Sequence, residues 1–300
     1  MRMVKESGVT CKQYLINFLN KCLEQGKHAI ESKKEFKVPI PKPFKESYNI
    51  VKSYRLITLE SLINKLLWRI MNERLEWYLE SGMLLSVTQD AYRKEHNCND
   101  TILRLVQTIQ EGWNAGMTVV VCFLDFDSYF ENIWRANLIC KLYDMGVRGR
   151  MLQLINDYLK DRQMKIAVNT KCSRWKTSSV GLPQGGVNSP NLANVYSRDS
   201  DNSETYKHAE FADDNIKAEM DYDENEAISR MQGRLDLFQL WLIRNNLSCG
   251  LPKVKAMIFR PPNSPRPYNK ANLFFNGFLI SEVDKYRILG TLLIDNRTVL

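Results

Sequence analysis

The sequence lacks the features that mark secreted, membrane-spanning and zinc-stabilised proteins. Its seven cysteines are odd in number and scattered, and no two of them form a Cys-x-x-Cys pair. This spacing argues against a disulfide framework and against a structural zinc site. No apolar run approaches the roughly 18 residues of a membrane-spanning helix, and the N-terminus has no apolar signal-peptide core. We therefore expect an intracellular protein, of the nucleus or the cytoplasm, with no membrane partner.

Glycine and proline are too scarce for a fibrous or low-complexity chain. The 300 residues include 14 Gly and 10 Pro, and 44% of all residues are apolar while 25% are charged. This composition is typical of one or two globular domains. Lysine and arginine number 42 against 34 Asp and Glu, which gives a formal net charge of +8. Such a basic excess suits a polyanionic partner but does not demonstrate one.

Apolar periodicity predicts alternating helices and strands, and hence an α+β protein. Helical spacing is present in residues 1–30, from about 59, in 133–160 and in 228–242. Strands are predicted for 118–124, 256–259 and 273–280, and hairpins for 164–178 and 209–220. Because the first helix shows no sign of starting a domain, we interpret the sequence as a fragment of a longer chain.

The segment 31–55 is extended and basic. It carries seven Lys or Arg against three Glu, and three prolines at 39, 41 and 43 disfavour a helix. We expect salt-dependent nucleic-acid binding to depend on this segment, through Lys33, Lys34, Lys37 and Lys42.

Acidic residues occur at two chemically informative places. Asp125 ends the buried strand 118–124, and Asp213-Asp214 lie within Phe-Ala-Asp-Asp at 211–214. If the two segments pair in one sheet, three carboxylates meet at its edge, and two like charges ~4 Å apart repel by about 4 kcal/mol. Hard oxygen ligands of this kind suit Mg²⁺. The alternative is an exposed turn in a solvated acidic face, since 210–226 holds eight Asp or Glu and one Lys.

The loop 181–190 (GLPQGGVNSP) favours a functional site over an exposed acidic turn. It combines adjacent glycines, two prolines and an amide before a helical stretch. Glycines let the backbone approach a ligand closely, and a helix N-terminus offers free N–H groups. The order Asp125, then this loop, then Phe-Ala-Asp-Asp is far more specific than any one of the three.

In this order, FLDFDSYFE (123–131), GLPQGGVNSP and FADD resemble the core motifs of reverse transcriptases. The flanking segments resemble non-LTR (LINE-type, jockey-like) retrotransposon enzymes. These segments are VPIPKP (38–43), SYRLITL (53–59), QDAYR (89–93), YLKDR (158–162), WLIRNNL (241–247), KVKAMIF (253–259) and YRILG (286–290). The resemblance covers residues 10–300. Two of these flanks, SYRLITL and WLIRNNL, count against a group II intron or telomerase-like enzyme, which shares the core.

The resemblance implies a right-hand polymerase fold and RNA-directed DNA synthesis. Nucleotidyl transfer from a dNTP to the 3′-OH of a DNA primer on an RNA template would use two Mg²⁺ ions, with Mn²⁺ as a possible substitute. The implied domains are a helical extension at 1–30, fingers at 31–117, palm at 118–260 and the end of the palm with the start of a largely missing thumb at 261–300.

Matching positions inherit expected roles from the family. The expected metal ligands are Asp125, Asp213, Asp214 and the carbonyl of Phe126. The expected nucleotide-binding residues are Lys42, Arg55, Phe130, Gln184 and Gly185, with the Phe130 ring as a steric gate against the ribose 2′-OH. Lys253 would protonate the leaving pyrophosphate, and Arg93 would contact the template. We expect Asp127 to be a solvated carboxylate and Trp241 a core residue, and the three histidines receive no role.

Several positions depart from the family's pattern. Tyr129 stands where a small residue usually lines the nucleotide pocket, and Glu131, Leu56, Ala91 and Asn215 also differ. The segment 194–205 is short and polar where the family has an apolar helix. These departures favour a second hypothesis, a decayed and catalytically inactive remnant that only binds nucleic acid. A Tyr129 ring that points into the nucleotide pocket would block synthesis, whereas a ring in the core would stabilise the fold.

Overall fold

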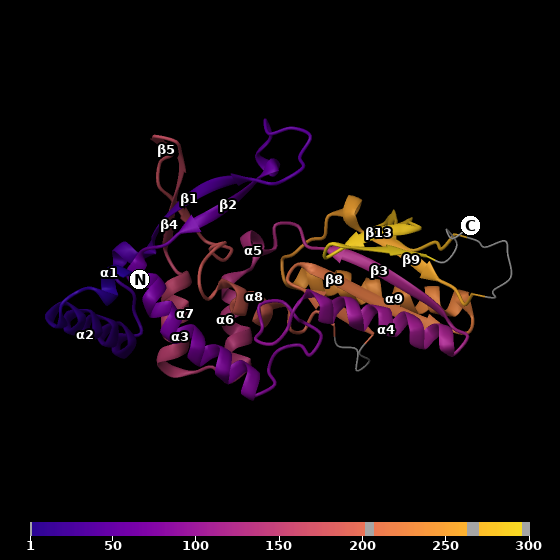
Figure 1. The fold of residues 1–300 in the computed structure, drawn as a ribbon, viewed down its shortest axis with the longest axis horizontal. Coiled ribbons are helices and arrows are strands. Elements are labelled where there is room, and N and C mark those ends of the chain that lie inside the picture. The colour runs from indigo at the N-terminus through magenta and orange to yellow at the C-terminus, as the bar shows by residue number, and fades with distance from the viewer. Residues whose placement is uncertain (1, 202–206, 263–269, 296–300) are drawn as a thin grey trace. The chain divides into compact units, whose positions relative to one another are not determined.

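The computed structural model describes residues 2–201, 207–262 and 270–295 (Figure 1). The chain forms two compact units, each made of two stretches of sequence. Unit 1 comprises residues 1–84 and 130–196, and unit 2 comprises 85–129 and 197–300. In the described part of the chain, no helix has both the length and the apolar content needed to cross a membrane.

Unit 1 combines helices with a small mixed sheet. Its helices are α1 (Arg2–Lys5), α2 (Val9–Gln25), α3 (Leu62–Ser81), α5 (Tyr129–Asn132), α6 (Arg135–Asp144), α7 (Gly149–Leu159) and α8 (Ser189–Ser197), with 3₁₀ turns at Ile30–Lys33 and Val51–Ser53. Its strands are β1 (Lys34–Pro41), β2 (Tyr54–Leu59), β4 (Arg162–Val168), β5 (Lys171–Cys172) and β6 (Lys176–Ser178). Strand β1 pairs antiparallel with β2 and parallel with β4.

Unit 2 is built on a sheet with the order β12-β9-β3-β8-β7 (Figure 1). These strands are β12 (Ser281–Glu282), β9 (Lys255–Phe259), β3 (Thr118–Asp125), β8 (Asp214–Asp221) and β7 (His208–Phe211). The other elements are α4 (Cys98–Asn114), α9 (Glu224–Arg244), the 3₁₀ turn Leu251–Lys253 and the hairpins β10 (Phe274–Phe275) with β11 (Phe278–Leu279) and β13 (Lys285–Ile288) with β14 (Thr291–Ile294).

Strand β3 is the buried centre of this sheet, as its seven apolar and β-branched residues predict. Its alternate residues Val119, Val121 and Phe123 form one core with α4 and the β13–β14 hairpin. Helix α9 packs on β3 and β8, where its Phe238 ring lies 4.3 Å from the Lys217 ammonium. A Cβ at Gly112 of α4 would lie only 2.2 Å from Val119 Cγ2. This glycine therefore permits the close approach of α4 to β3.

Most predicted elements are confirmed, and three are corrected. The N-terminal helix is interrupted after Lys5 and continues as α2. The predicted strand 273–280 is wrong, because Asn276 and Gly277 both have positive φ and make the turn of the β10–β11 hairpin. A wholly solvated acidic face at 210–226 is also wrong, because the Glu210 side chain is buried.

Candidate active site

The three predicted metal ligands lie at one end of the unit 2 sheet. Asp125 on β3 and Asp214 on β8 are directly opposite each other in the antiparallel register. Residues Ala212 and Asp213 form the two-residue turn of the β7–β8 hairpin, since Phe211 pairs with Asp214. The Phe126 N–H donates to the Asp213 carbonyl oxygen at 3.3 Å, which ties the turn to the end of β3.

Lys253 reaches the same end of the sheet from a different segment. Its ammonium forms a short ion pair with the Asp125 carboxylate. Two backbone hydrogen bonds place this segment beside β3: Gly250 N–H donates to the Asp125 carbonyl at 3.2 Å, and Asp127 N–H donates to the Ser248 carbonyl at 2.8 Å. The family-implied position of Lys253 near the carboxylates thus has a direct counterpart in the fold.

Burial and mutual repulsion dominate the electrostatics of this cluster. Burial raises the pKa of Asp214 to about 7, and the neighbouring Asp213 and Asp125 charges contribute to this rise, against the opposing Lys253 charge. Burial alone would lower the pKa of Lys253, but its bond to Asp125 and the charges of Asp127 and Asp213 raise the pKa overall. Asp214 therefore holds a proton more tightly than an isolated aspartate does, and Lys253 holds its proton more tightly than an isolated lysine does.

The donor set has the chemistry that a divalent cation requires. Carboxylate oxygens are hard ligands of the kind that Mg²⁺ prefers. A cation would relieve the repulsion that raises the pKa of Asp214. In the described ranges, no group of three His, Cys, Asp or Glu side chains is arranged to hold a metal ion. A cation bound by these oxygens would compete with Lys253 for Asp125 and with a proton for Asp214.

Two aromatic residues that follow Asp125, Phe126 and Tyr129, belong to the core of unit 2. The Phe126 and Tyr129 rings stack with centroids 4.8 Å apart, and each residue is only 3% exposed. The Phe126 ring also packs near Phe238 and Trp241. Tyr129 thus takes the second of its two predicted orientations, in the core. Trp241 is half-buried and stacks on the buried Phe238 ring at the edge of this core.

The predicted nucleotide-binding residues lie in unit 1, on a hairpin and the adjoining loop. Arg55 on β2 is exposed and pairs with Ile40 of β1, and the Lys42 N–H donates to the Ser53 carbonyl at 2.8 Å. The Thr58 N–H donates to the Gln184 carbonyl at 2.7 Å. This bond joins the end of β2 to the loop 181–190.

The same loop is tied to the segment that carries Phe130. The Leu182 N–H donates to the Phe130 carbonyl, and the Gly181 N–H donates to the Ile133 carbonyl at 2.8 Å. Gly181 has a φ of +80°, and a Cβ there would lie 2.5 Å from the Glu131 carbonyl oxygen, so only glycine fits. Unit 1 therefore brings Phe130, Gln184 and the β1–β2 hairpin into one connected region.

A buried polar network lies under this region. Arg162 forms ion pairs with Glu35 and Glu60, and the Tyr158 hydroxyl bonds Glu60. Burial raises the pKa of Glu60 and lowers that of Arg162. The polar atoms of these side chains bond mainly to one another, so the network holds the residues beneath the loop in fixed positions.

Arg93 lies in unit 2, where its guanidinium donates to the Ser86 and Gln89 carbonyls at 2.9 and 3.1 Å. These bonds organise the segment 86–93. Sequence reasoning placed three neighbours of the aspartates, Gln89, Tyr92 and Tyr286, in segments that resemble the family but gave them no role. The Gln89 side chain accepts a hydrogen bond from the Ala212 N–H. Burial raises the pKa of Tyr92, and the Asp213 charge adds to this rise. Burial likewise raises the pKa of Tyr286, and the Asp214 and Asp125 charges add to this rise. Only pairing between distant segments creates these contacts.

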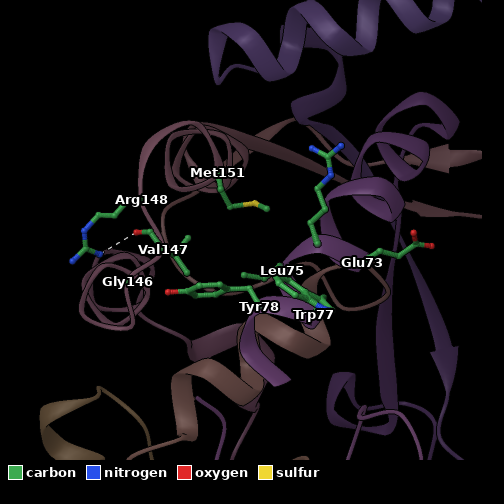
Figure 2. A pocket seen from close by; sticks show the side chains of 9 residues that line it. Glu73, Leu75, Trp77, Tyr78, Gly146, Val147, Arg148 and Met151 are labelled. Carbon is green, nitrogen blue, oxygen red and sulfur yellow. Dashed lines mark hydrogen bonds between the residues drawn. The ribbon is translucent and has the colours of Figure 1, made fainter. Parts of the chain in front are cut away.

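A separate apolar cavity of about 500 Å³ lies between α3 and the segment 146–151 (Figure 2). Leu75, Tyr78 and Met151 line it, and Figure 2 shows Arg148 directed away from the space. The Tyr78 hydroxyl donates to the Met145 carbonyl at 2.9 Å, which ties α3 to this segment. None of the predicted site residues lines this cavity.

Comparisons with known proteins agree with the motif order. The family described as "Reverse transcriptase (RNA-dependent DNA polymerase)" matches residues 40–293. The RNA-directed DNA polymerase from mobile element jockey of Drosophila funebris is 25% identical over 288 residues, covering 93% of this chain and 31% of that protein. Its counterpart from Drosophila melanogaster is also 25% identical, covering 80% of this chain and 26% of that protein. The chain thus spans less than a third of these relatives.

Solved structures with the same fold include telomerases from Candida tropicalis. Apo telomerase has a TM-score of 0.58 at 10% identity, covering 95% of this chain and 52% of that chain. A form truncated from the C-terminal domain has a TM-score of 0.57 at 10% identity, covering 93% of this chain and 57% of that chain. At this identity the likeness concerns the fold alone, and it confirms the predicted α+β, right-hand polymerase class.

Proposed function

The chain belongs to the reverse transcriptase (RNA-dependent DNA polymerase) family, with relatives among non-LTR retrotransposons, and we propose that it extends a DNA primer on an RNA template. The observation that carries this proposal is the opposition of Asp125 and Asp214 across β3 and β8, with Asp213 in the adjoining turn. Paired carboxylates at a sheet end are the ligand set that two-metal nucleotidyl transfer requires.

In this proposal Asp125, Asp213 and Asp214 hold two Mg²⁺ ions, with the Phe126 carbonyl as a further ligand. The ions supply charge neutralisation and activation of the primer 3′-OH. A cation on the Asp125 carboxylate would take the place of Lys253 there, and the Lys253 Nζ would donate its proton to the leaving pyrophosphate. Its place beside Asp125 supports this role, because a lysine ammonium is protonated at neutral pH and can act as a general acid.

The unit 1 residues bind the incoming nucleotide in this proposal. Arg55 and Lys42 bind the triphosphate, for which the guanidinium offers bidentate geometry. Gln184 and the Gly185 backbone line the nucleotide pocket, and the Phe130 ring excludes a 2′-OH. The hydrogen bonds from Thr58 to Gln184 and from Leu182 to Phe130 support a preorganised pocket. Arg93 contributes to template binding by holding the segment 86–93, whose carbonyls its guanidinium bonds, in place.

Two observations favour an enzyme over an inactive nucleic-acid-binding remnant. The Tyr129 ring lies in the core rather than in solvent, so its size does not argue for a blocked pocket. The three aspartates are retained at the same sheet end as Lys253. Both the carboxylates and a residue suited to proton transfer are therefore in place.

The test is primer extension by the purified protein on an RNA template with a DNA primer and dNTPs. We expect extension with Mg²⁺ or Mn²⁺ and none when EDTA removes the metal. A matched reaction with rNTPs should give little product, because the Phe130 gate would exclude the 2′-OH. Absence of extension with either metal, by protein that remains folded, would overturn the proposal.

A further inference from the structure

Gln89 makes a buried contact with the turn that carries Asp213. Its side-chain Oε1 accepts hydrogen bonds from the Ala212 N–H and the Ala91 N–H, each at 3.0 Å, and the residue is 1% exposed. The backbone on either side is bonded to β7: Asp90 N–H donates to the Glu210 carbonyl at 3.0 Å, and Glu210 N–H donates to the Thr88 carbonyl at 2.9 Å. The glutamine is therefore held against the hairpin from a distant segment.

The turn needs such a support because its backbone is strained. Ala212 has a φ of +58°, in the left-handed region that residues with a Cβ disfavour. In a two-residue hairpin this position is usually glycine. A non-glycine residue persists in this conformation when its surroundings fix it. The Gln89 hydrogen bond to the Ala212 N–H is one such constraint, placed one residue before Asp213.

Gln89 is itself anchored by other contacts in unit 2. The Arg93 guanidinium bonds the Gln89 carbonyl at 3.1 Å. The next residue, Asp90, is fully buried and accepts from Thr101 Oγ1 at 2.8 Å and from Arg104 Nη2 at 3.2 Å, both on α4. A continuous set of polar contacts therefore connects α4 to the Ala212–Asp213 turn.

We propose that Gln89 is a positioning residue that fixes the Ala212–Asp213 turn, and thereby Asp213 and Asp214, in the geometry needed for nucleotidyl transfer. The catalytic part of this inference rests on the proposed polymerase function. The Gln89 side chain acts through the Ala212 N–H and does not itself touch the reacting atoms. Mutating a residue that holds metal ligands in position, without binding the metal itself, usually lowers metal affinity or activity by about 10- to 100-fold.

The test compares Gln89→Met, which removes the acceptor at similar side-chain volume, with Gln89→Glu, which keeps an Oε1 acceptor. The matched control is Gln232→Met, because Gln232 makes the same type of bond to the Phe274 N–H at 2.8 Å in unit 2. Two readouts are needed: hydrogen exchange of the Ala212 amide, and kcat and KM for dNTPs in primer extension.

We expect Gln89→Met to exchange the Ala212 amide faster and to lower kcat by about 10- to 100-fold, with KM for dNTPs changed less than about twofold. Gln89→Glu should keep the slow exchange, and Gln232→Met should leave both readouts unchanged. Unchanged exchange or unchanged kcat in folded Gln89→Met would overturn the positioning role. If the wild type extends no primer, the proposed function fails, while the exchange comparison still decides whether Gln89 fixes the turn.

Discussion

The Tyr129 ring stacks on the Phe126 ring at an interplanar angle of 18°, and both residues are buried. Truncating a buried aromatic side chain in a packed core costs about 3–5 kcal/mol. We therefore predict that Tyr129→Ala lowers the free energy of unfolding by this amount, whereas Tyr129→Phe, which keeps the ring, has a much smaller effect. Denaturant unfolding checks this. A Tyr129→Ala protein of wild-type stability that incorporates dNTPs faster would instead place the ring in the nucleotide pocket.

His28 gives unit 1 a predictable dependence on pH. Burial lowers its pKa to about 4 against the opposing Asp157 charge. Its Nδ1 lies 3.3 Å from Asp157, and Nε2 has no hydrogen-bond partner in the described part of the chain. Because the folded-state pKa lies below the ordinary value of 6.5, the folded protein binds fewer protons than the unfolded chain between pH 4 and 6.5.

The stability from neutral His28 is therefore complete above about pH 6.5 and declines as the pH falls toward 4. We predict that the wild type loses about 2 kcal/mol more stability between pH 7 and pH 5 than His28→Gln does. Urea unfolding of both proteins at the two pH values measures this difference. Equal losses would show that His28 is protonated in the folded protein.

At the scale of elements, the β1–β2 hairpin concentrates exposed positive charge, but not at all the predicted lysines. Lys33 pairs with Asp157 at 2.9 Å, Lys34 pairs with Glu31 at 3.1 Å, and burial lowers the pKa of Lys37. These contacts weaken the sequence-based expectation that all four lysines bind phosphates. The exposed positive charges on and beside the hairpin are Lys45, Lys52 and Arg55, and Lys42 is half-buried.

We predict that replacing Lys42, Lys45, Lys52 and Arg55 with glutamine makes the log–log salt dependence of duplex binding shallower, by about 0.9 for each phosphate that the protein no longer neutralises. Replacing Lys33 and Lys34 serves as the control and should change the slope little. Fluorescence anisotropy across a salt series provides the measurement. The hairpin is not the binding surface if the quadruple variant keeps the wild-type slope.

The polar segment before β7, which departs from the family's apolar pattern, contributes matched partners to unit 2. The Trp241 Nε1–H donates to Asp199 at 2.9 Å, and the Ser200 hydroxyl bonds Glu210. Asp201 accepts from Lys217 and from Arg234, each at 2.7 Å. Residues 202–205 lie outside the described ranges. The polar side chains of residues 199–201 therefore serve as hydrogen-bond and ion-pair partners for buried polar groups of β7, β8 and α9.

Removing one partner of a buried ion pair leaves an uncompensated charge and costs about 3–5 kcal/mol. We predict a loss of this size for Asp201→Asn, because two buried cations would lose their shared carboxylate. Asp236→Asn, at an exposed position on α9, should stay within about 0.5 kcal/mol of the wild type. Chemical denaturation of both variants checks this. An Asp201→Asn protein as stable as the wild type would mean that the segment does not support the fold.

The same elements show how far sequence reasoning extends. The apolar run 118–124 predicted β3 with Asp125 at its end, since a central strand needs apolar side chains on both faces. The contact between Gln89 and Ala212 was not predictable, because it depends on pairing between segments 123 residues apart. The ion pair of Lys253 with Asp125 depends on the 248–250 segment running beside 125–127, although the resemblance implied their proximity. The Asn276-Gly277 pair is a local turn signal, but the apolar residues on both sides of it favoured one continuous strand over 273–280.

At the scale of the whole molecule, the order of motifs carries the family assignment, and the net charge of +8 suits a nucleic-acid partner. Both units are made of segments that alternate along the chain. Composition and periodicity predicted the α+β class but not this division, because each unit is closed by contacts between distant segments. The predicted fingers and palm boundaries stay predictions.

The central claim is that the carboxylates at the end of the β3–β8 pair catalyse RNA-templated synthesis. Its most direct test is primer extension on an RNA template with Mg²⁺ by wild type and Asp213→Asn, together with the free energy of unfolding of each protein. We predict that the wild type extends the primer and the variant does not, while the variant is as stable or slightly more stable, because one charge leaves a repelling cluster. Comparable extension by the two proteins would contradict the account.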